Sequence, residues 1–315
     1  MSSRPQEGPD PVRDRNPVTL PRLREMKAAG EPIVMVTAYD HPSAQVAEEA
    51  GVDMVLVGDS AAMTVLGHDS TVPVGMEEML MLAAAVRRGL RTPFLVGDLP
   101  FGSYERSNDH AVENALRFIK EAGCDAVKLE RGGASVDRAR AIIQAGIPVM
   151  AHVGLTPQTA TQLGGYKAQG KTAERAAQIA EEALALQAAG CFAIVFEAVP
   201  SAITEALMPK MKIPVIGIGA GLGTDGQVLV FHDLLGIFSG HAAKFVKRYA
   251  NVREEMVRGV SEFAAEVRSG VFPGPEHIYA IEPVELSEFR AYLDQDTLAR
   301  DAGGTFSHSD WDWGP

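Results

Sequence analysis

The sequence predicts an α/β fold, a (β/α)8 or TIM barrel, and three observations lead to it. Short runs of β-branched and other apolar residues recur along the chain. Alanine-rich segments with helical spacing separate these runs, and eight such units occupy about 250 residues, the usual length of this barrel. Near-continuous apolar strands that alternate with helices are typical of a parallel sheet covered on both faces. A doubly wound open sheet shares this alternation and is the alternative fold.

The predicted strands begin after residue 31 and continue to residue 233. They occupy residues 32–40, 53–60, 93–98, 125–130, 147–154, 192–200, 213–221 and 226–233. Helical spacing is found in residues 76–89, 108–122, 136–145 and 173–189. Asn108 and Thr172 are predicted N-caps, because short polar side chains satisfy the first free N–H groups of a helix. The glycines of "EAGCDAV", "QAGIPV" and "AAGCFAI" each follow a helix and precede a strand, as helix C-caps do.

The domain organisation follows from the two ends of this pattern. Residues 1–17 are rich in proline and charge and are predicted to be a disordered lead. The catalytic barrel is expected over 18–275. Residues 276–315 form an acidic extension, with nine carboxylates against two arginines, which contributes −7 of the net charge of −12. A short helix is expected near 284–293.

Composition and charge exclude several classes of protein. A net charge of −12 argues against a general nucleic-acid binder, which needs a basic surface. No apolar run approaches the ~18 residues of a membrane span. The first residues lack the apolar core of a secretory signal. Cys124 and Cys191 suggest neither a disulfide framework nor a zinc site, and two core thiols favour a reducing, cytoplasmic location.

Two of the apolar runs, "MVLVGDSAAM" and "FLVGDLPFG", lead directly into a carboxylate, Asp59 and Asp98. In a barrel the carboxyl ends of the strands meet at one mouth, where the active site lies. The polar residues expected there are Asp40, Asp59, Ser60, Asp98, Lys128, Glu130, His152 and Glu197. A single acidic residue after a strand is most often a helix N-cap or a loop residue. Its recurrence at several strand ends favours a site.

Carboxylates gathered at one mouth repel one another unless positive charge lies among them. Lys128 supplies one charge, and a divalent cation would supply two more. Oxygen ligands without a zinc-like Cys or His spacing favour Mg²⁺, with Mn²⁺ possible. A 2-oxo acid would chelate such an ion, which then acts as a Lewis acid and stabilises an enolate. The residues alone lead to metal-assisted enolate chemistry and no further.

Several longer segments resemble one family. These are "VTAYDHPSAQVAEEAGVDMVLVGDSAAMTVLGHDSTVPV", "VGDLPFGSY", "AVKLE", "PVMAHVGLTPQ", "FEAVP" and "IPVIGIGAG" with the following "TDGQVLV". Together, from about residue 18 to 273, they closely resemble ketopantoate (3-methyl-2-oxobutanoate) hydroxymethyltransferases. The resemblance implies a barrel of the phosphoenolpyruvate/pyruvate superfamily. It also implies transfer of a hydroxymethyl group from 5,10-methylenetetrahydrofolate to 3-methyl-2-oxobutanoate, giving 2-dehydropantoate in pantothenate synthesis through a Mg-stabilised enolate. A cytoplasmic homo-oligomer, a decamer in this family, is implied as well.

The resemblance also implies the roles of individual residues. Asp59 and Asp98 resemble the magnesium ligands, with Glu130 completing the surroundings of the metal. The residues expected to contact the oxo acid are Asp59, Ser60, Asp98, Lys128 and His152. Glu197 resembles the general base. Lys128 and Glu130 fit this arrangement physically, because residues i and i+2 of a strand point to the same side.

Two alternatives remain open for the function. A magnesium-dependent lyase or mutase acting on a 2-oxo acid would use the same core, and a non-catalytic barrel would use none of it. The glycine-rich "GIGAGLG" lacks the spacing of a dinucleotide-binding loop. The long segment 155–171 is either a surface connection or a lid.

Overall fold

The computed structural model describes residues 15–163, 165, 168–238, 240 and 243–294. Most of the predicted disordered lead, 1–17, and the end of the predicted acidic extension lie outside the described residues.

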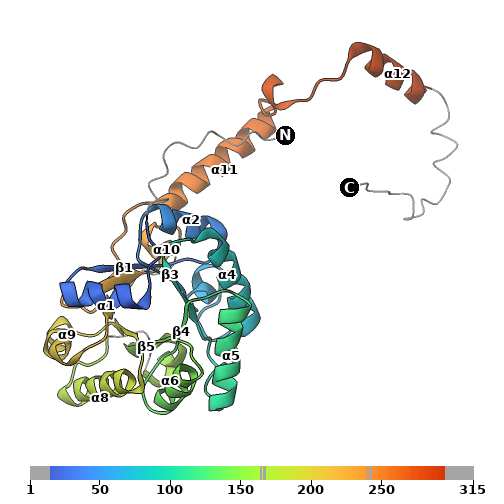
Figure 1. Cartoon of the computed structure of the whole chain (residues 1–315). Helices are drawn as coiled ribbons and strands as arrows, with labels where there is room; N and C mark the ends of the chain where they lie inside the picture. Colours follow the sequence, from blue (N-terminus) through green and yellow to red (C-terminus); the bar gives the residue numbers. More distant parts are fainter. Residues whose placement is uncertain (1–14, 164, 166–167, 239, 241–242, 295–315) are drawn as a thin grey trace. The chain divides into compact units, whose positions relative to one another are not determined.

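The eight predicted runs form one closed barrel of parallel strands (Figure 1), each hydrogen-bonded to the next, with β8 returning to β1. The strands are β1 (Ile33–Thr37), β2 (Met54–Val57), β3 (Phe94–Asp98), β4 (Ala126–Lys128), β5 (Val149–Gly154), β6 (Ala193–Glu197), β7 (Val215–Ile218) and β8 (Gly226–Leu229). The predicted (β/α)8 barrel is confirmed, and the open sheet is excluded because the barrel closes.

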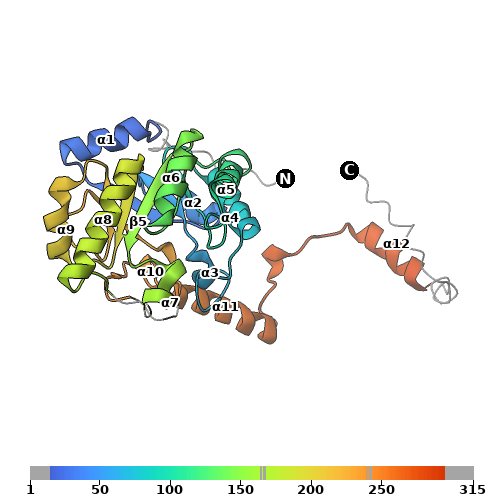
Figure 2. The same ribbon diagram turned by 90° about the horizontal axis from the view of Figure 1, so that it is seen from below.

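Helices surround the strands (Figures 1 and 2). They are α2 (His41–Glu49), α3 (Ala61–Thr64), α4 (Met76–Gly89), α5 (Asn108–Lys120), α6 (Ala134–Gln144), α7 (Ala160–Leu163), α8 (Ala173–Ala189), α9 (Ser201–Leu207) and α10 (Phe231–Leu234). Thr172 caps α8 as predicted, because its side chain accepts from the Arg175 N–H. The Asn108 prediction was wrong. Ser107 is the cap of α5 and accepts from the His110 N–H, so Asn108 is the first helical residue.

The connection between β7 and β8 departs from the regular alternation. Residues 219–225, all of them described, join the two strands without a helix. Gly219 and Gly221 have φ values of +67° and +86°, which glycine adopts without strain. At the end of this connection, the Asp225 carboxylate accepts from the Val215 N–H and the Lys27 ammonium, which fixes the return of the chain. A dinucleotide-binding loop requires a helix directly after its glycines. Here the glycines are followed by a strand, β8, and not by a helix.

The barrel is closed at its amino-terminal end by α1 (Leu20–Ala29). Leu23 and Met26 of this helix are fully buried and pack in the same core cluster as the inward-facing Ile33 and Met35. A second, larger core cluster lies between the strands and the surrounding helices. The carboxyl ends of the strands are therefore the end at which a site can open.

The chain divides into two compact units, the first ending at Arg253 and the second beginning at Glu254. Within the second unit, α12 (Pro283–Asp294) confirms the helix expected near 284–293. Helix α11 (Val252–Ser269) has no buried residue. The predicted functional boundary after residue 275 stays a prediction. No helix in the described part of the chain is long and apolar enough to cross a membrane.

Candidate active site

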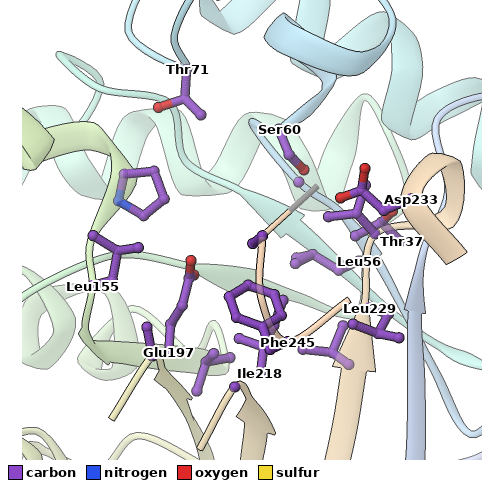
Figure 3. A pocket seen from close by; sticks show the side chains of 18 of the residues that line it. Thr37, Leu56, Ser60, Thr71, Leu155, Glu197, Ile218, Leu229, Asp233 and Phe245 are labelled. Carbon is purple, nitrogen blue, oxygen red and sulfur yellow. The ribbon is translucent and has the colours of Figure 1, made fainter. Parts of the chain in front are cut away.

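A cavity of about 840 Å³ lies at the carboxyl ends of the strands, and its lining contains most of the predicted site residues. These are Asp59, Ser60, Asp98, Lys128, Glu130, His152 and Glu197. Figure 3 shows the Glu197 carboxylate pointing into this space. Ser60, Asp233 and the ring of Phe245 border the same space. Asp40 is not among the lining residues. It caps α2 by accepting from the Ser43 N–H at 2.8 Å, which is the ordinary role of an acidic residue after a strand.

Strand register brings the charged residues of the cluster together. Asp98 ends β3 and is paired in register with Lys128, which ends β4. His152 lies within β5, and Glu197 ends the neighbouring β6. Asp59 follows β2 by two residues. Residues more than a hundred positions apart thus share one buried surface because adjacent parallel strands end at the same level.

Lys128 and Asp98 form the central ion pair. The Lys128 Nζ lies 2.8 Å from both carboxylate oxygens of Asp98 and 3.8 Å from Glu130 Oε1. Both partners are almost fully buried. Burial by itself lowers the pKa of Lys128, but the Asp98, Glu130 and Asp59 carboxylates outweigh it and hold that pKa above its usual range. The lysine therefore stays charged.

Asp59 is the carboxylate of the cluster whose negative charge is least offset by nearby positive charge. Its backbone N–H donates to Asp98 Oδ2 at 3.2 Å, and one side-chain oxygen accepts from Gln158 Nε2 at 3.0 Å. Burial raises the pKa of Asp59 well above its ordinary value, and the charges of Asp98 and Glu130 raise it further. Burial likewise raises the pKa of Asp98, with Lys128 opposing the shift. The protein alone supplies too little positive charge at this point.

His152 lies between two carboxylates. Its Nδ1 is 3.2 Å from Glu130 Oε1, and its Nε2 is 3.2 Å from Glu197 Oε2, at ion-pair distance but without the alignment of hydrogen bonds. Burial lowers the pKa of His152, but the two carboxylates outweigh burial and raise it to about 9. The imidazole is therefore a cation at neutral pH that joins Glu130 to Glu197.

Two carboxylate-bearing strand ends continue into unusual backbone. Arg131 and Ala198, with φ values of 74° and 51°, are the non-glycine residues with positive φ among those described. They directly follow Glu130 and Glu197. The Arg131 N–H donates to His152 O, and the Ala198 N–H donates to Ile218 O. Strained backbone of this kind costs about 1–3 kcal/mol and is common at functional sites, where it directs a side chain.

Asp233 and Lys244 of the cavity lining were missed from the sequence, as were three residues that hydrogen-bond to the cluster. The hydroxyl of Tyr39 is 2.8 Å from Ser60 Oγ, and the buried Gln158 and Tyr104 hydrogen-bond to each other beside Asp59 and Glu130. Gln158 stands in "GLTPQ", directly after β5, so its position near a strand end was the available signal. The beginning of the segment 155–171 lies at the cavity, since Leu155 and Pro157 line it, and the choice between a surface connection and a lid stays a prediction. Its residues 164, 166 and 167 lie outside the described residues.

In the predicted cluster four carboxylates, those of Asp59, Asp98, Glu130 and Glu197, face one lysine and one histidine. Two negative charges remain when all six groups are ionised. Asp233 and Lys244 also line the cavity, with one charge of each sign. A closed parallel barrel that buries such a cluster at the carboxyl ends of its strands defines a (β/α)8-barrel enzyme.

Solved structures and relatives specify this class further. The barrel superposes on phosphonopyruvate hydrolase in complex with oxalate and Mg²⁺ with a TM-score of 0.54, 15% identity, and 90% and 98% of the two chains covered. It superposes on 2,3-dimethylmalate lyase, a member of the PEP mutase/isocitrate lyase superfamily, with a TM-score of 0.52, 14% identity, and 91% and 98% covered. These likenesses show the fold.

The family model for ketopantoate hydroxymethyltransferase matches residues 17–275. The chain is 50% identical to 3-methyl-2-oxobutanoate hydroxymethyltransferase 1, mitochondrial, of Arabidopsis thaliana over 304 residues, which cover 93% of this chain and 88% of the relative. It is 53% identical to 3-methyl-2-oxobutanoate hydroxymethyltransferase of Moorella thermoacetica, with 84% and 98% covered. The chain belongs to the ketopantoate hydroxymethyltransferase family and is an enzyme of this kind.

Proposed function

We propose that this enzyme transfers a hydroxymethyl group from 5,10-methylenetetrahydrofolate to 3-methyl-2-oxobutanoate and so produces 2-dehydropantoate. The observation that carries the proposal is the buried cluster of Asp59, Asp98 and Lys128 on the wall of the cavity. With a divalent cation bound, such a cluster would suit a substrate that is a chelating anion and a reaction in which negative charge develops on an oxygen. Family membership then selects this substrate among 2-oxo acids.

A divalent cation fits the residues present. Asp59 and Asp98 offer the hard oxygen donors that Mg²⁺ prefers, and Mn²⁺ can replace it. The raised pKa of Asp59 marks a shortage of positive charge. No three His, Cys, Asp or Glu side chains within the described ranges are arranged to enclose an ion by themselves. That suits Mg²⁺, which keeps waters and substrate oxygens among its ligands. Asp59 and Asp98 would hold it, with Glu130 completing its surroundings, and it would supply Lewis-acid stabilisation of charge on the keto oxygen.

The side chains around this point have separate roles. Lys128, already fixed by Asp98, and the half-buried Ser60 bind the oxo acid. Glu197, whose side chain is 15% exposed and reaches the cavity, removes the proton from C3. His152 holds Glu197 at 3.2 Å and thereby directs it. The electron pair released at C3 forms the new C–C bond to the folate methylene. Both C–N bonds of the folate methylene break, one to make the methylene carbon electrophilic and one to release the product. Water supplies the hydroxyl oxygen, and the two folate nitrogens take up the proton from C3 and a proton from water.

The half-reaction can be tested without the folate. NMR should show exchange of the C3 hydrogen of 3-methyl-2-oxobutanoate in D₂O when enzyme and Mg²⁺ are present, and none when Mg²⁺ is removed with EDTA. Exchange without any cleavage or rearrangement product separates the transferase from a lyase or mutase. If no exchange occurs while the complete mixture still forms 2-dehydropantoate, the assigned order of steps is wrong.

We also propose that the chain assembles as a homo-oligomer, a decamer by family resemblance. Helix α11 supports assembly, because its exposed apolar residues Met256, Val260, Phe263 and Val267 would gain from burial against another subunit. Analytical ultracentrifugation of the full chain measures the state directly. The cytoplasmic location stays a prediction, since the names of several plant relatives specify mitochondria.

A further inference from the structure

One uncharged residue joins two carboxylates of the active site, one through its backbone N–H and one through its side chain. Gln158 lies in the 3₁₀ turn Pro157–Thr159 that follows β5, and it is 4% exposed. Its backbone N–H donates to Glu130 Oε2 at 3.2 Å. Its side-chain Nε2 donates to Asp59 Oδ2 at 3.0 Å and to Leu99 O at 2.9 Å. The two ends of a single residue thus hold the carboxylates of two different strand ends.

The orientation of the Gln158 amide is fixed by its neighbours. The hydroxyl of Tyr104 donates to Gln158 Oε1 and itself accepts from the Glu130 N–H at 3.3 Å. If the amide were reversed, its oxygen would face the Leu99 carbonyl and the Asp59 carboxylate, which are both acceptors. The reversed amide is therefore disfavoured by repulsion, and its NH₂ end is directed at Asp59. Tyr104 is also buried, so water does not compete for these bonds.

The chemical type of this residue has a consequence for cation binding. A lysine or arginine in the same place would neutralise Asp59 and compete with a divalent ion for it. An amide fixes the carboxylate by a hydrogen bond and adds no net charge. The negative charge of Asp59 therefore remains available to a cation, while its side chain is held in one orientation. Such supporting hydrogen bonds to ligating groups typically raise metal affinity about 10–100-fold.

We propose that Gln158 is a positioning residue that orients Asp59 for the divalent cation, and that Tyr104 acts on Asp59 only through Gln158. The inference rests on the proposed metal site at Asp59 and Asp98. It assigns a role to the turn Pro157–Thr159 after β5.

The test is Mn²⁺ binding to the full-length metal-free chain, measured by EPR of the free ion without substrate or turnover. The parent should bind Mn²⁺, and Gln158→Ala should weaken binding about 10–100-fold. Tyr104→Phe keeps the ring but removes the hydroxyl, so it should weaken binding by a smaller factor of about 3–10. In the double variant, Tyr104→Phe should add no further loss, because its partner is already gone. Gln178→Ala, on the exposed surface of α8, is the matched control and should bind as the parent does.

Circular dichroism and thermal melting establish that each variant is folded. If Gln158→Ala does not fold, Tyr104→Phe alone still tests the inference. A dissociation constant within twofold of the parent in both folded variants would overturn it, even if both were less stable. An additive loss in the double variant would overturn the route through Gln158. Failure of the parent to bind Mn²⁺ would overturn the metal site and this inference with it.

Discussion

Replacing Lys128 by methionine tests whether the active site is short of positive charge. Met has a similar length and keeps apolar contacts, but it leaves the Asp98 carboxylate without the ammonium that lies 2.8 Å from both its oxygens. Asp59 and Glu130 then face Asp98 in the same buried space. Removing one partner of a buried ion pair costs about 3–5 kcal/mol. For a domain of this size, that corresponds to a Tm lower by roughly 6–20 °C.

The loss should depend on pH in a defined direction. The pKa of Asp59 lies well above its ordinary value of 3.8 in the folded chain. A carboxyl group whose pKa is raised by folding contributes stability that is present below its unfolded pKa and is lost as pH rises through the folded pKa. Without Lys128 the pKa values of Asp59 and Asp98 rise further. The destabilisation should therefore be largest near pH 8 and shrink as the pH is lowered toward 5.

Differential scanning calorimetry in EDTA at several pH values measures both effects. Lys120→Met, which removes an exposed lysine from the end of α5, is the control and should shift Tm by no more than about 1–2 °C. A Lys128→Met protein that melts within 2 °C of the parent at pH 8 would refute the reasoning. A destabilisation that grows as the pH falls would refute it as well, because repulsion between ionised carboxylates would then not be the cause of the destabilisation.

The remaining predictions concern chemistry, the termini and the thiols. Glu197→Gln should reduce C3 hydrogen exchange about 10²–10⁴-fold, as loss of a positioned base does. Binding of the oxo acid, measured by calorimetry, should stay within about tenfold of the parent, or ~1.4 kcal/mol. Exchange at the parental rate would exclude Glu197 as the base. Asp59→Ala should instead lose binding and exchange together, and an unchanged Mg²⁺ titration would contradict its assignment. A chain ending at residue 275 should keep most of its turnover in a steady-state assay, and loss of activity in a folded truncated chain would contradict this. Burial raises the pKa of the Cys124 and Cys191 thiols to about 12, so an aromatic disulfide reagent at pH 8 should label both only after denaturation; rapid labelling of the native protein would show that they are accessible.

Prediction of the fold succeeded because its signals are local. Apolar runs and alanine-rich helices are each complete within 5 to 20 residues, and the parallel sheet follows from their alternation. The prediction of helix caps failed where two neighbouring residues are both suitable for the same position. Ser107 and Asn108 are both good caps, and only the backbone decides between them. The absence of a helix between β7 and β8 reflects a connection of seven residues, too few for a helix and two turns.

Strand ends predicted most of the site, but they could not separate Asp40 from Asp59. Both follow an apolar run, yet Asp40 caps a helix while Asp59 is buried beside Asp98. Gln158 and Tyr104 have no charge and lie in loops, and they were missed.

The sequence by itself determined the barrel, the parallel orientation of its strands and the carboxylates at their carboxyl ends. Periodicity and strand-end position are properties of neighbouring residues. Only the tertiary structure decided which groups share one environment. The register of β3 with β4 places Lys128 on Asp98, and the turn after β5 brings Gln158 to Asp59, 99 positions away. The physical reason is that burial and charge act through space. The pKa of Asp59 depends on Asp98 and Glu130, which folding alone brings near it.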